Sequence, residues 1–310
     1  MEVPLLDETV EGVVDYHGHP VCRSISGGWR SASLIIAVEI AERFAYFGVS
    51  SNLINFLTDQ LHQSTATAAK NVNTWSGTAT LLPLLGAFLA DCFLGRYRTI
   101  VFSSALYILG LGFLTVYATL PSPDISACQE TENSLTCSPN LVQVMVFFFS
   151  LYLVAFAQGG HKPCVQAFGA DQFDGQHPEE SKAKSSFFNW WYFGISLASL
   201  FTVNIMSYVQ DYLSWSLGFG ILCIAMVFAL AIFLLGTRTY RFSNRGDEEN
   251  PFVRIGRVFI TAIRNLHVNS SEIAHVEETH GLLPHNNSTQ LSKEDDRGRM
   301  IKQDHCVEFK

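Results

Sequence analysis

Apolar residues gather in six long stretches of the chain, separated by short polar segments. A helix needs about 20 apolar residues to cross the hydrocarbon of a membrane, and each stretch reaches or nearly reaches this length. The stretches lie at about residues 34–57, 72–93, 100–120, 141–164, 187–209 and 216–236. Short connections bring successive helices back beside one another, so the pattern predicts an all-α membrane protein built on a six-helix bundle.

Two further segments follow the sixth stretch. The first, NPFVRIGRVFITAIRN, puts apolar and basic residues on different sides of a helix, which predicts an amphipathic helix at the inner membrane surface. From His267 onward the chain is polar and charged, which predicts disorder. The predicted regions are a cytosolic tail (1–30), the transmembrane bundle (31–236), a cytosolic linker with the amphipathic helix (237–266) and a disordered cytosolic tail (267–310).

Composition agrees with a lipid bilayer as the surroundings. The chain is 48% hydrophobic and only 15% charged. Its net charge of −8 argues against nucleic acid as a partner. We find no Ser/His/Asp constellation and no nucleotide loop, so we expect neither an enzyme nor a cofactor.

The basic residues predict the orientation, because cytosolic segments carry more Lys and Arg. With a cytosolic N-terminus, only Lys70 falls in an outside loop. The inside segments then hold Arg23, Arg30, Arg96, Arg98, Lys182, Lys184, Arg238, Arg241 and Arg245. Both termini are therefore predicted to face the cytosol.

Two cysteines, Cys128 and Cys137, share the third loop between helices, on the predicted outer face. A disulfide could persist there, and two free thiols remain the alternative. In the N-terminal tail, His17, His19 and Cys22 could ligate a metal. We expect no metal site, because that segment is a polar tail and the seven cysteines form no zinc spacing.

Charged residues interrupt the first apolar stretch at VEIAERFAYFG, residues 38–48. At about 100° per residue, Glu39, Glu42, Arg43 and Tyr46 fall on one stripe of a helix. Ionised side chains inside a membrane pair with one another and face a cavity. Two carboxylates and one guanidinium leave one carboxylate in excess, which predicts a proton site. A structural ion cluster that only holds helices together is the alternative.

A second motif, GAFLADCFLGRYRT, joins the second and third stretches. Gly86 and Gly95 allow close helix approach. Asp91 lies near a helix end, where it can bond an arginine, and Arg96 and Arg98 begin the cytosolic turn. The segment is predicted to act in gating and helix packing.

Thr99 follows Arg96 by three residues, which is a pattern for basophilic kinases. It is a candidate phosphorylation site on the cytosolic side. The alternative is a threonine that caps a helix.

A lysine lies within the fourth stretch, in AQGGHKPCVQAFGADQFD. A lysine inside a membrane needs a counter-anion, so Lys162 is predicted to line the substrate cavity. The alternative is a side chain that extends to the lipid headgroups.

Four segments together resemble the plant nitrate/peptide transporter family, its fifth subfamily most of all. They are VEIAERFAYFG, LLGAFLADCFLGRYRTI, GGHKPCVQAFGADQFD and SSFFNWWYFGIS. This family is related to the proton-coupled oligopeptide transporters of the major facilitator superfamily. The resemblance implies that Glu39, Glu42 and Arg43 couple protons to substrate.

The resemblance also implies a substrate cavity lined by Tyr46, Lys162 and Tyr192. The usual partner of the lysine is a glutamate in the tenth helix. Tyr192 stands where many peptide transporters carry an asparagine, which weakens the inference of a peptide substrate. The implied location is the plasma membrane, with the vacuolar membrane as the alternative.

Members of this family have twelve helices in two halves, with substrate held between the halves. The chain corresponds to the first half. One hypothesis is a proton-coupled transporter of nitrate, another small anion or short peptides. The other is a truncated, non-transporting form that pairs with a second copy or regulates a full-length transporter.

Overall fold

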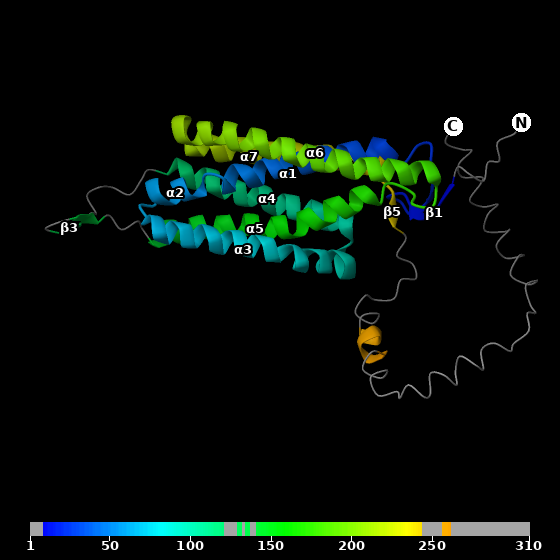
Figure 1. The fold of residues 1–310 in the computed structure, drawn as a ribbon, viewed down its shortest axis with the longest axis horizontal. Coiled ribbons are helices and arrows are strands. Elements are labelled where there is room, and N and C mark those ends of the chain that lie inside the picture. The colour runs from blue at the N-terminus through cyan, green and yellow to red at the C-terminus, as the bar shows by residue number, and fades with distance from the viewer. Residues whose placement is uncertain (1–8, 121–128, 132–133, 137–140, 244–255, 262–310) are drawn as a thin grey trace, which may run out of the picture. The chain divides into compact units, whose positions relative to one another are not determined.

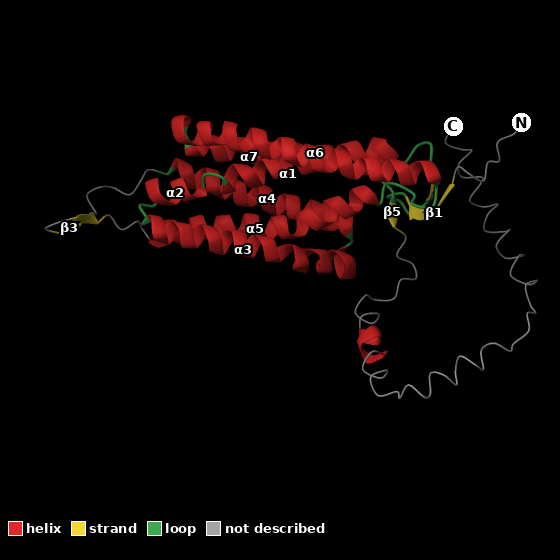
Figure 2. Ribbon diagram, viewed as in Figure 1, coloured by secondary structure: helices red, strands yellow, loops and turns green. Residues whose placement is uncertain are grey.

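The computed structural model describes residues 9–120, 129–131, 134–136, 141–243 and 256–261 (Figure 1). Two compact units are present, and residues 26–241 form the larger one. It is a bundle of long helices lying alongside one another (Figure 2). The helices are α1 (Gly28–Ser50), α2 (Leu53–Asp59), α3 (Thr65–Leu89), α4 (Arg96–Thr119), α5 (Leu141–Ala170), α6 (Pro178–Tyr208) and α7 (Trp215–Leu235). The predicted six-helix bundle is confirmed, with α2 as a short extra helix after the first.

Five helical segments of the described residues are long and apolar enough to cross a membrane. They are Thr65–Leu94, Arg96–Thr119, Leu141–Ala170, Pro178–Leu213 and Trp215–Thr239. The sixth predicted span, α1, has 23 residues but includes Arg30, Glu39, Glu42 and Arg43. Its polar residues lower its hydropathy, and the last three of these are buried in the bundle.

Strands are short and lie outside the helices. In the smaller unit, β1 (Thr9–Val14) pairs antiparallel with β2 (Pro20–Cys22) and with β5 (Phe242–Ser243). A separate hairpin joins β3 (Gln129–Thr131) and β4 (Ser134–Thr136). The predicted N-terminal tail therefore contains a small sheet, which the alternation of apolar and polar residues in TVEGVV permits.

A turn between β1 and β2 is organised by Asp15. Its Oδ1 accepts hydrogen bonds from the backbone N–H groups of His17 and His19, each at 2.8 Å. Partial burial acts to raise the pKa of the Asp15 carboxyl, but these N–H donors and the nearby His19 ring outweigh it, so its pKa is lowered. The two histidines thus stabilise a turn in this segment.

An aromatic core fills one end of the bundle. Phe56 of α2 stacks on Phe147 of α5, with ring centroids 4.9 Å apart. Trp215 and Phe219 of α7 contact the ring of Phe56 edge-on. Because such pairs bury large apolar areas and add a preferred ring geometry, they hold α2, α5 and α7 together.

Two of the long helices end in a π-turn. The segment Ala90–Leu94 follows α3, and Val209–Leu213 follows α6. Each is closed by a bond to the carbonyl five residues earlier, from Gly95 to Ala90 (2.9 Å) and from Ser214 to Val209 (3.0 Å). These turns connect α3 to α4 and α6 to α7.

Arg241, the last residue of the larger unit, is 1% exposed and lies in a group of polar contacts that we call the Arg241 cage. Its guanidinium donates to Glu180 at 2.7 Å and to the carbonyl of Ser26 at 2.8 Å. Its backbone N–H donates to the side chain of Gln172 at 2.8 Å. Gly27 has φ +69°, and a Cβ there would lie 2.2 Å from Nε of Arg241. The cage joins the start of α1, the α5–α6 connection and the segment after α7.

Helices α3 and α5 approach each other closely at Gly86. A Cβ at this position would lie 2.1 Å from the carbonyl oxygen of Gly159 and 2.7 Å from the Cα of Gly160. These are backbone atoms, so a larger residue would force the two helices apart. The small residues that the sequence places here are the reason for the tight packing.

We expect Gly86→Ala to destabilise the bundle by about 1 to 3 kcal/mol, because overpacking moves backbone as well as side chains. Gly77→Ala on the same helix is the control, since nothing lies within 4 Å of its added Cβ. Thermal unfolding of the two purified variants measures the difference. Equal melting temperatures for both would contradict the close packing.

Candidate functional site

The charged stripe of α1 lies inside the bundle. Glu39 is 2% exposed, Glu42 is 0% exposed and Arg43 is 4% exposed. All three belong to α1, where Glu39 lies about one turn before the adjacent Glu42 and Arg43. Because an ionised group costs several kcal/mol in hydrocarbon, burial inside the protein is the arrangement that such residues require.

One arginine serves both carboxylates. Nε of Arg43 lies 3.2 Å from Oε1 of Glu39 and 2.5 Å from Oε2 of Glu42. A second nitrogen of the guanidinium also pairs with Glu42. The cluster therefore holds two carboxylates and one guanidinium, as the sequence predicts. One oxygen of Glu39, Oε2, is buried and has no hydrogen-bond partner among the described residues.

Aromatic rings complete the wall of the cluster. The guanidinium carbon of Arg43 lies 5.4 Å from the ring centroid of Tyr46, which is a cation–π contact. Tyr46 stacks on Trp75 of α3, with centroids 5.7 Å apart. The indole N–H of Trp75 donates to the carbonyl of Leu151 at 3.0 Å. Tyr46 is thus held next to the charges, one turn from Arg43.

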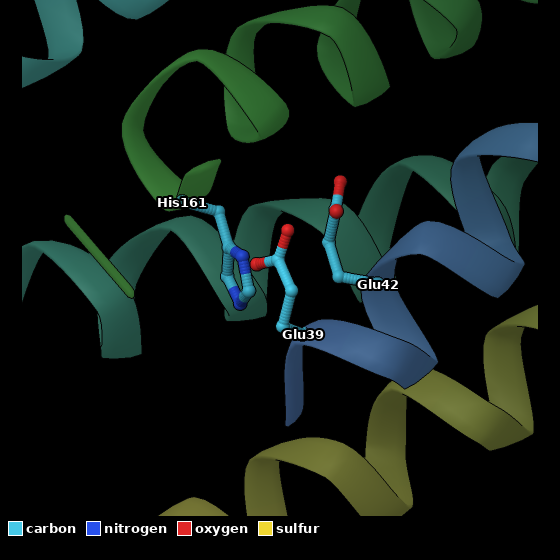
Figure 3. Close-up of side chains that lie close together, drawn as sticks. All are labelled: Glu39, Glu42 and His161. Atoms are coloured by element: carbon cyan, nitrogen blue, oxygen red, sulfur yellow. The ribbon is translucent and has the colours of Figure 1, made fainter. Parts of the chain in front are cut away.

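Two residues that sequence reasoning missed join the cluster from other helices. His161 of α5 is 0% exposed, and one of its ring nitrogens lies within 4.8 Å of a carboxylate oxygen of Glu39 and of Glu42. Figure 3 shows the imidazole against the carboxylate of Glu39. Tyr107 of α4 is buried and interacts electrostatically with Glu42. His161 directly precedes Lys162 in the motif GGHKPCVQAFGADQFD. This position beside a predicted cavity residue is the signal by which the sequence could have indicated it.

The other predicted cavity residues lie differently. Lys162 is exposed, yet it is close enough to Glu39 and Glu42 to act on both electrostatically. Among the described residues it forms no ion pair. Tyr192 is 61% exposed on α6, and no hydrogen bond or ring contact of the described residues joins its side chain to the cluster. The structure thus brings Tyr46 to the cluster and leaves Tyr192 on an open face of α6.

The second motif forms a separate polar group at the π-turn after α3. Arg96 donates to Asp171 at 2.5 Å and to Asp91 at 3.4 Å. Asp171 follows α5 and was not predicted from the sequence. Gly95 has φ +83° at the start of α4, and Arg98 is exposed. The arginine therefore ties the start of α4 to the ends of α3 and α5.

Thr99, the candidate phosphorylation site, is buried in the structure. The residue is 3% exposed, so a kinase would not reach it in this conformation. Its hydroxyl donates to the carbonyl of Gly95 at 2.9 Å, one turn back along α4. This bond is also not a cap, because a capping side chain accepts from a backbone N–H. The physical reason is the packing of α4 on α5, where Thr99 lies near Gly160.

The predicted disulfide between Cys128 and Cys137 lies outside the described residues, as does the tail after residue 261. Among the described cysteines, Cys92, Cys164 and Cys223 are free thiols. In the segment with His17 and His19, the polar contacts already described stabilise a turn.

Residues 97–306 match the sequence profile of the POT family. Among curated proteins, Protein NRT1/PTR FAMILY 5.10 of Arabidopsis thaliana is 60% identical over 289 residues, covering 93% of this chain and 50% of the relative. Protein NRT1/PTR FAMILY 5.15 of the same plant is 55% identical, and the match covers 85% of this chain and 47% of that relative. The chain belongs to the POT family. The resemblance seen in the sequence is confirmed, and this POT family chain spans about half the length of the curated relatives it matches.

Solved structures agree with the fold of the POT family chain. The POT family transporter PepTSo superimposes with a TM-score of 0.59 at 28% identity, covering 71% of this chain and 40% of that one. A peptide transporter POT in complex with sulfate gives a TM-score of 0.59 over 90% of this chain and 50% of that one. Its 16% identity supports the fold alone. The chain therefore shares the fold of POT family transporters over part of their length.

Proposed function

We propose that this chain is the N-terminal half of a proton-coupled transporter for nitrate, another small anion or short peptides. The observation that supports it most is the cluster of two buried carboxylates that share one arginine. Burial makes two negative charges beside one guanidinium unfavourable, so the cluster is suited to take up one proton. A proton that binds and leaves at such a site can be linked to substrate movement.

The substrate side of the proposal rests on Lys162. Its ammonium is exposed and next to the carboxylates, so it offers a positive charge on an accessible face of α5. An anion or the carboxylate of a peptide would complement it. Tyr46 lies beside the charges, and we propose that it lines the same cavity, with Tyr192 contributing from the open face of α6.

The proposal extends to the membrane in which the protein lies and to its orientation there. We propose a multi-pass protein of the plasma membrane, or of the vacuolar membrane, with both termini in the cytosol. The excess of basic residues on one side of the helix ends supports this orientation. A reporter fused to either terminus and tested for protease protection in sealed vesicles would give the orientation.

Proton-driven uptake is the decisive experiment. It compares the 310-residue chain with a complete transporter, in which this chain is followed by the second half of Protein NRT1/PTR FAMILY 5.10. We expect uptake of nitrate or of a dipeptide by the complete transporter to increase at acidic pH and to stop with a protonophore. Uptake that ignores pH and protonophore would overturn the proposal.

The same experiment tests the half-length form. If the chain alone reduces uptake when it is expressed beside the complete transporter, the regulatory hypothesis gains direct support. If the chain alone has no effect in either setting, that hypothesis is excluded under these conditions.

A further inference from the structure

His161 has no role in the proposed function so far, although it lies in the middle of the charged cluster. The residue is completely buried in α5, and neither ring nitrogen has a hydrogen-bond partner among the described residues. A buried imidazole without a partner is unfavourable, because its polar atoms have lost their water. Such a side chain needs either a ligand or a proton donor close by.

The nearest acceptors and donors are the carboxylates of α1. One ring nitrogen of His161 and one oxygen each from Glu39 and Glu42 lie within 4.8 Å of one another. Figure 3 shows the ring edge facing the Glu39 carboxylate, with Glu42 beside it. Oε2 of Glu39 is also buried and has no partner among the described residues. Two buried side chains that each have an unpartnered polar atom therefore lie close together.

The charges around this gap favour a proton over a metal ion. Arg43 already bonds both carboxylates, and Lys162 adds a second positive charge nearby. A divalent cation would bring two positive charges to a site where one guanidinium already bonds both carboxylates, whereas a proton brings only one. A single proton on Glu39 would instead give the imidazole a donor.

The remaining neighbours do not compete for that proton. From α4, the side chain that faces the cluster is Tyr107, which interacts with Glu42. Helix α3 packs against α5 through Gly86, and Lys70, near its start, is its only titratable residue. From α5 itself, Lys162 is the titratable neighbour, and from α1 the charge of Arg43 also acts on His161. Glu39 and Glu42 are both close enough to exchange a proton with His161. We assign the exchange to Glu39, because it has fewer contacts with Arg43 than Glu42 has.

We propose that His161 is a second proton acceptor of the cluster and shares the transported proton with Glu39. In the transfer, the O–H bond of the protonated Glu39 breaks and an N–H bond forms on His161, leaving a carboxylate and an imidazolium. The reverse step returns the proton, and the total charge of the cluster is unchanged. This inference rests on the proposed proton coupling, since the proton shared is the one that is transported.

A second acceptor changes how tightly the cluster holds its proton. The proton can reside on either of two groups, so the cluster stays protonated to a higher pH than Glu39 alone would allow. Removal of His161 should therefore move the pH dependence of uptake to lower pH. A residue that only packs in the bundle would change the rate equally at every pH.

Uptake of nitrate and of a dipeptide by the complete transporter, measured against external pH, tests this effect. For His161→Gln and His161→Asn, which keep a polar group and do not titrate, we expect half-maximal uptake to move down by about 0.3 pH unit, the effect of losing one of two equivalent acceptors. Gln158→Met is the matched control, because Gln158 is buried one turn earlier on α5 and cannot titrate. It should leave the midpoint unchanged. An unchanged midpoint in both His161 variants would overturn the inference.

A second measurement does not depend on the substrate. In the purified complete transporter with ¹⁵N-labelled histidine, the ring signal of His161 is the one that His161→Gln removes. We expect this signal to show protonation of the ring as the pH is lowered, and Glu39→Gln to move the midpoint of that change. A signal that stays neutral throughout, or that ignores Glu39→Gln, would overturn the inference.

The two results separate this inference from the proposed function. If the complete transporter takes up neither probe in a proton-dependent way, the proposed function fails, and the NMR titration alone decides whether Glu39 and His161 share a proton. If proton-driven uptake is present and is lost in Glu42→Gln, the proposed function stands. An unchanged pH dependence of uptake in the two His161 variants would then contradict only the proposal that His161 is a second proton acceptor.

Discussion

Glu42→Gln is expected to abolish proton-driven uptake by the complete transporter. Glu42 is 0% exposed and receives two contacts from Arg43, so its carboxylate is built into the cluster. Glutamine keeps the size and one oxygen but has no negative charge, so the cluster loses the excess negative charge that favours binding of a proton. We expect at least about a tenfold loss of uptake at acidic pH, and the remaining uptake should no longer depend on pH.

Glu179→Gln is the control for this change. It makes the same chemical replacement at an exposed position in the first turn of α6. Its uptake should follow the unmodified transporter at every pH. Full proton-driven uptake in Glu42→Gln would contradict the assignment of the proton to this cluster and would favour a purely structural ion pair.

Arg241→Met is expected to be the most destabilising of the single changes considered. The substitution removes the buried guanidinium of the Arg241 cage, and with it the ion pair to Glu180, whose side chain is 13% exposed. Removing one partner of a buried ion pair costs about 3 to 5 kcal/mol. The hydrogen bonds from the guanidinium to the carbonyl of Ser26 are lost at the same time.

Thermal unfolding of the complete transporter in detergent measures this loss. Arg238→Met is the matched control, since Arg238 is exposed and only three residues away, and it should change stability by less than about 0.5 kcal/mol. The double change Glu180→Gln with Arg241→Met should recover part of the loss, because it also removes the negative charge that Arg241 balanced. Similar melting temperatures for Arg241→Met and Arg238→Met would contradict the role of the cage.

The helices and the charged stripe were predictable because their signals are local. Long apolar stretches predict spanning helices, and Glu39, Glu42 and Arg43 share a stripe through spacing alone. The pairing of Arg43 with both carboxylates follows from this spacing. The family resemblance came from short motifs, and its specificity came from their joint occurrence.

The contacts that depend on tertiary packing could not be predicted in the same way. His161 and Tyr107 reach the cluster from α5 and α4, and their sequence distance from Glu42 carries no signal of contact. Asp171 pairs with Arg96 across 75 positions, and Glu180 pairs with Arg241 across 61. The burial of Thr99 could not be predicted either, because it depends on the close approach of Gly160 to α4. A local kinase pattern carries no information about that contact.

The π-turns after α3 and α6 set the direction in which the chain enters the helices that follow them. A π-turn contains one residue more than an α-helical turn. Deleting one residue from Ala90–Leu94 would change by about 100° the direction in which the chain leaves α3, and would so displace the start of α4 around the axis of α3. The contact of Arg96 with Asp171 would then be lost, and Tyr107 would move away from Glu42. The extra residue in the turn thus sets the direction in which the chain enters α4 and so the place of α4 beside the proton site.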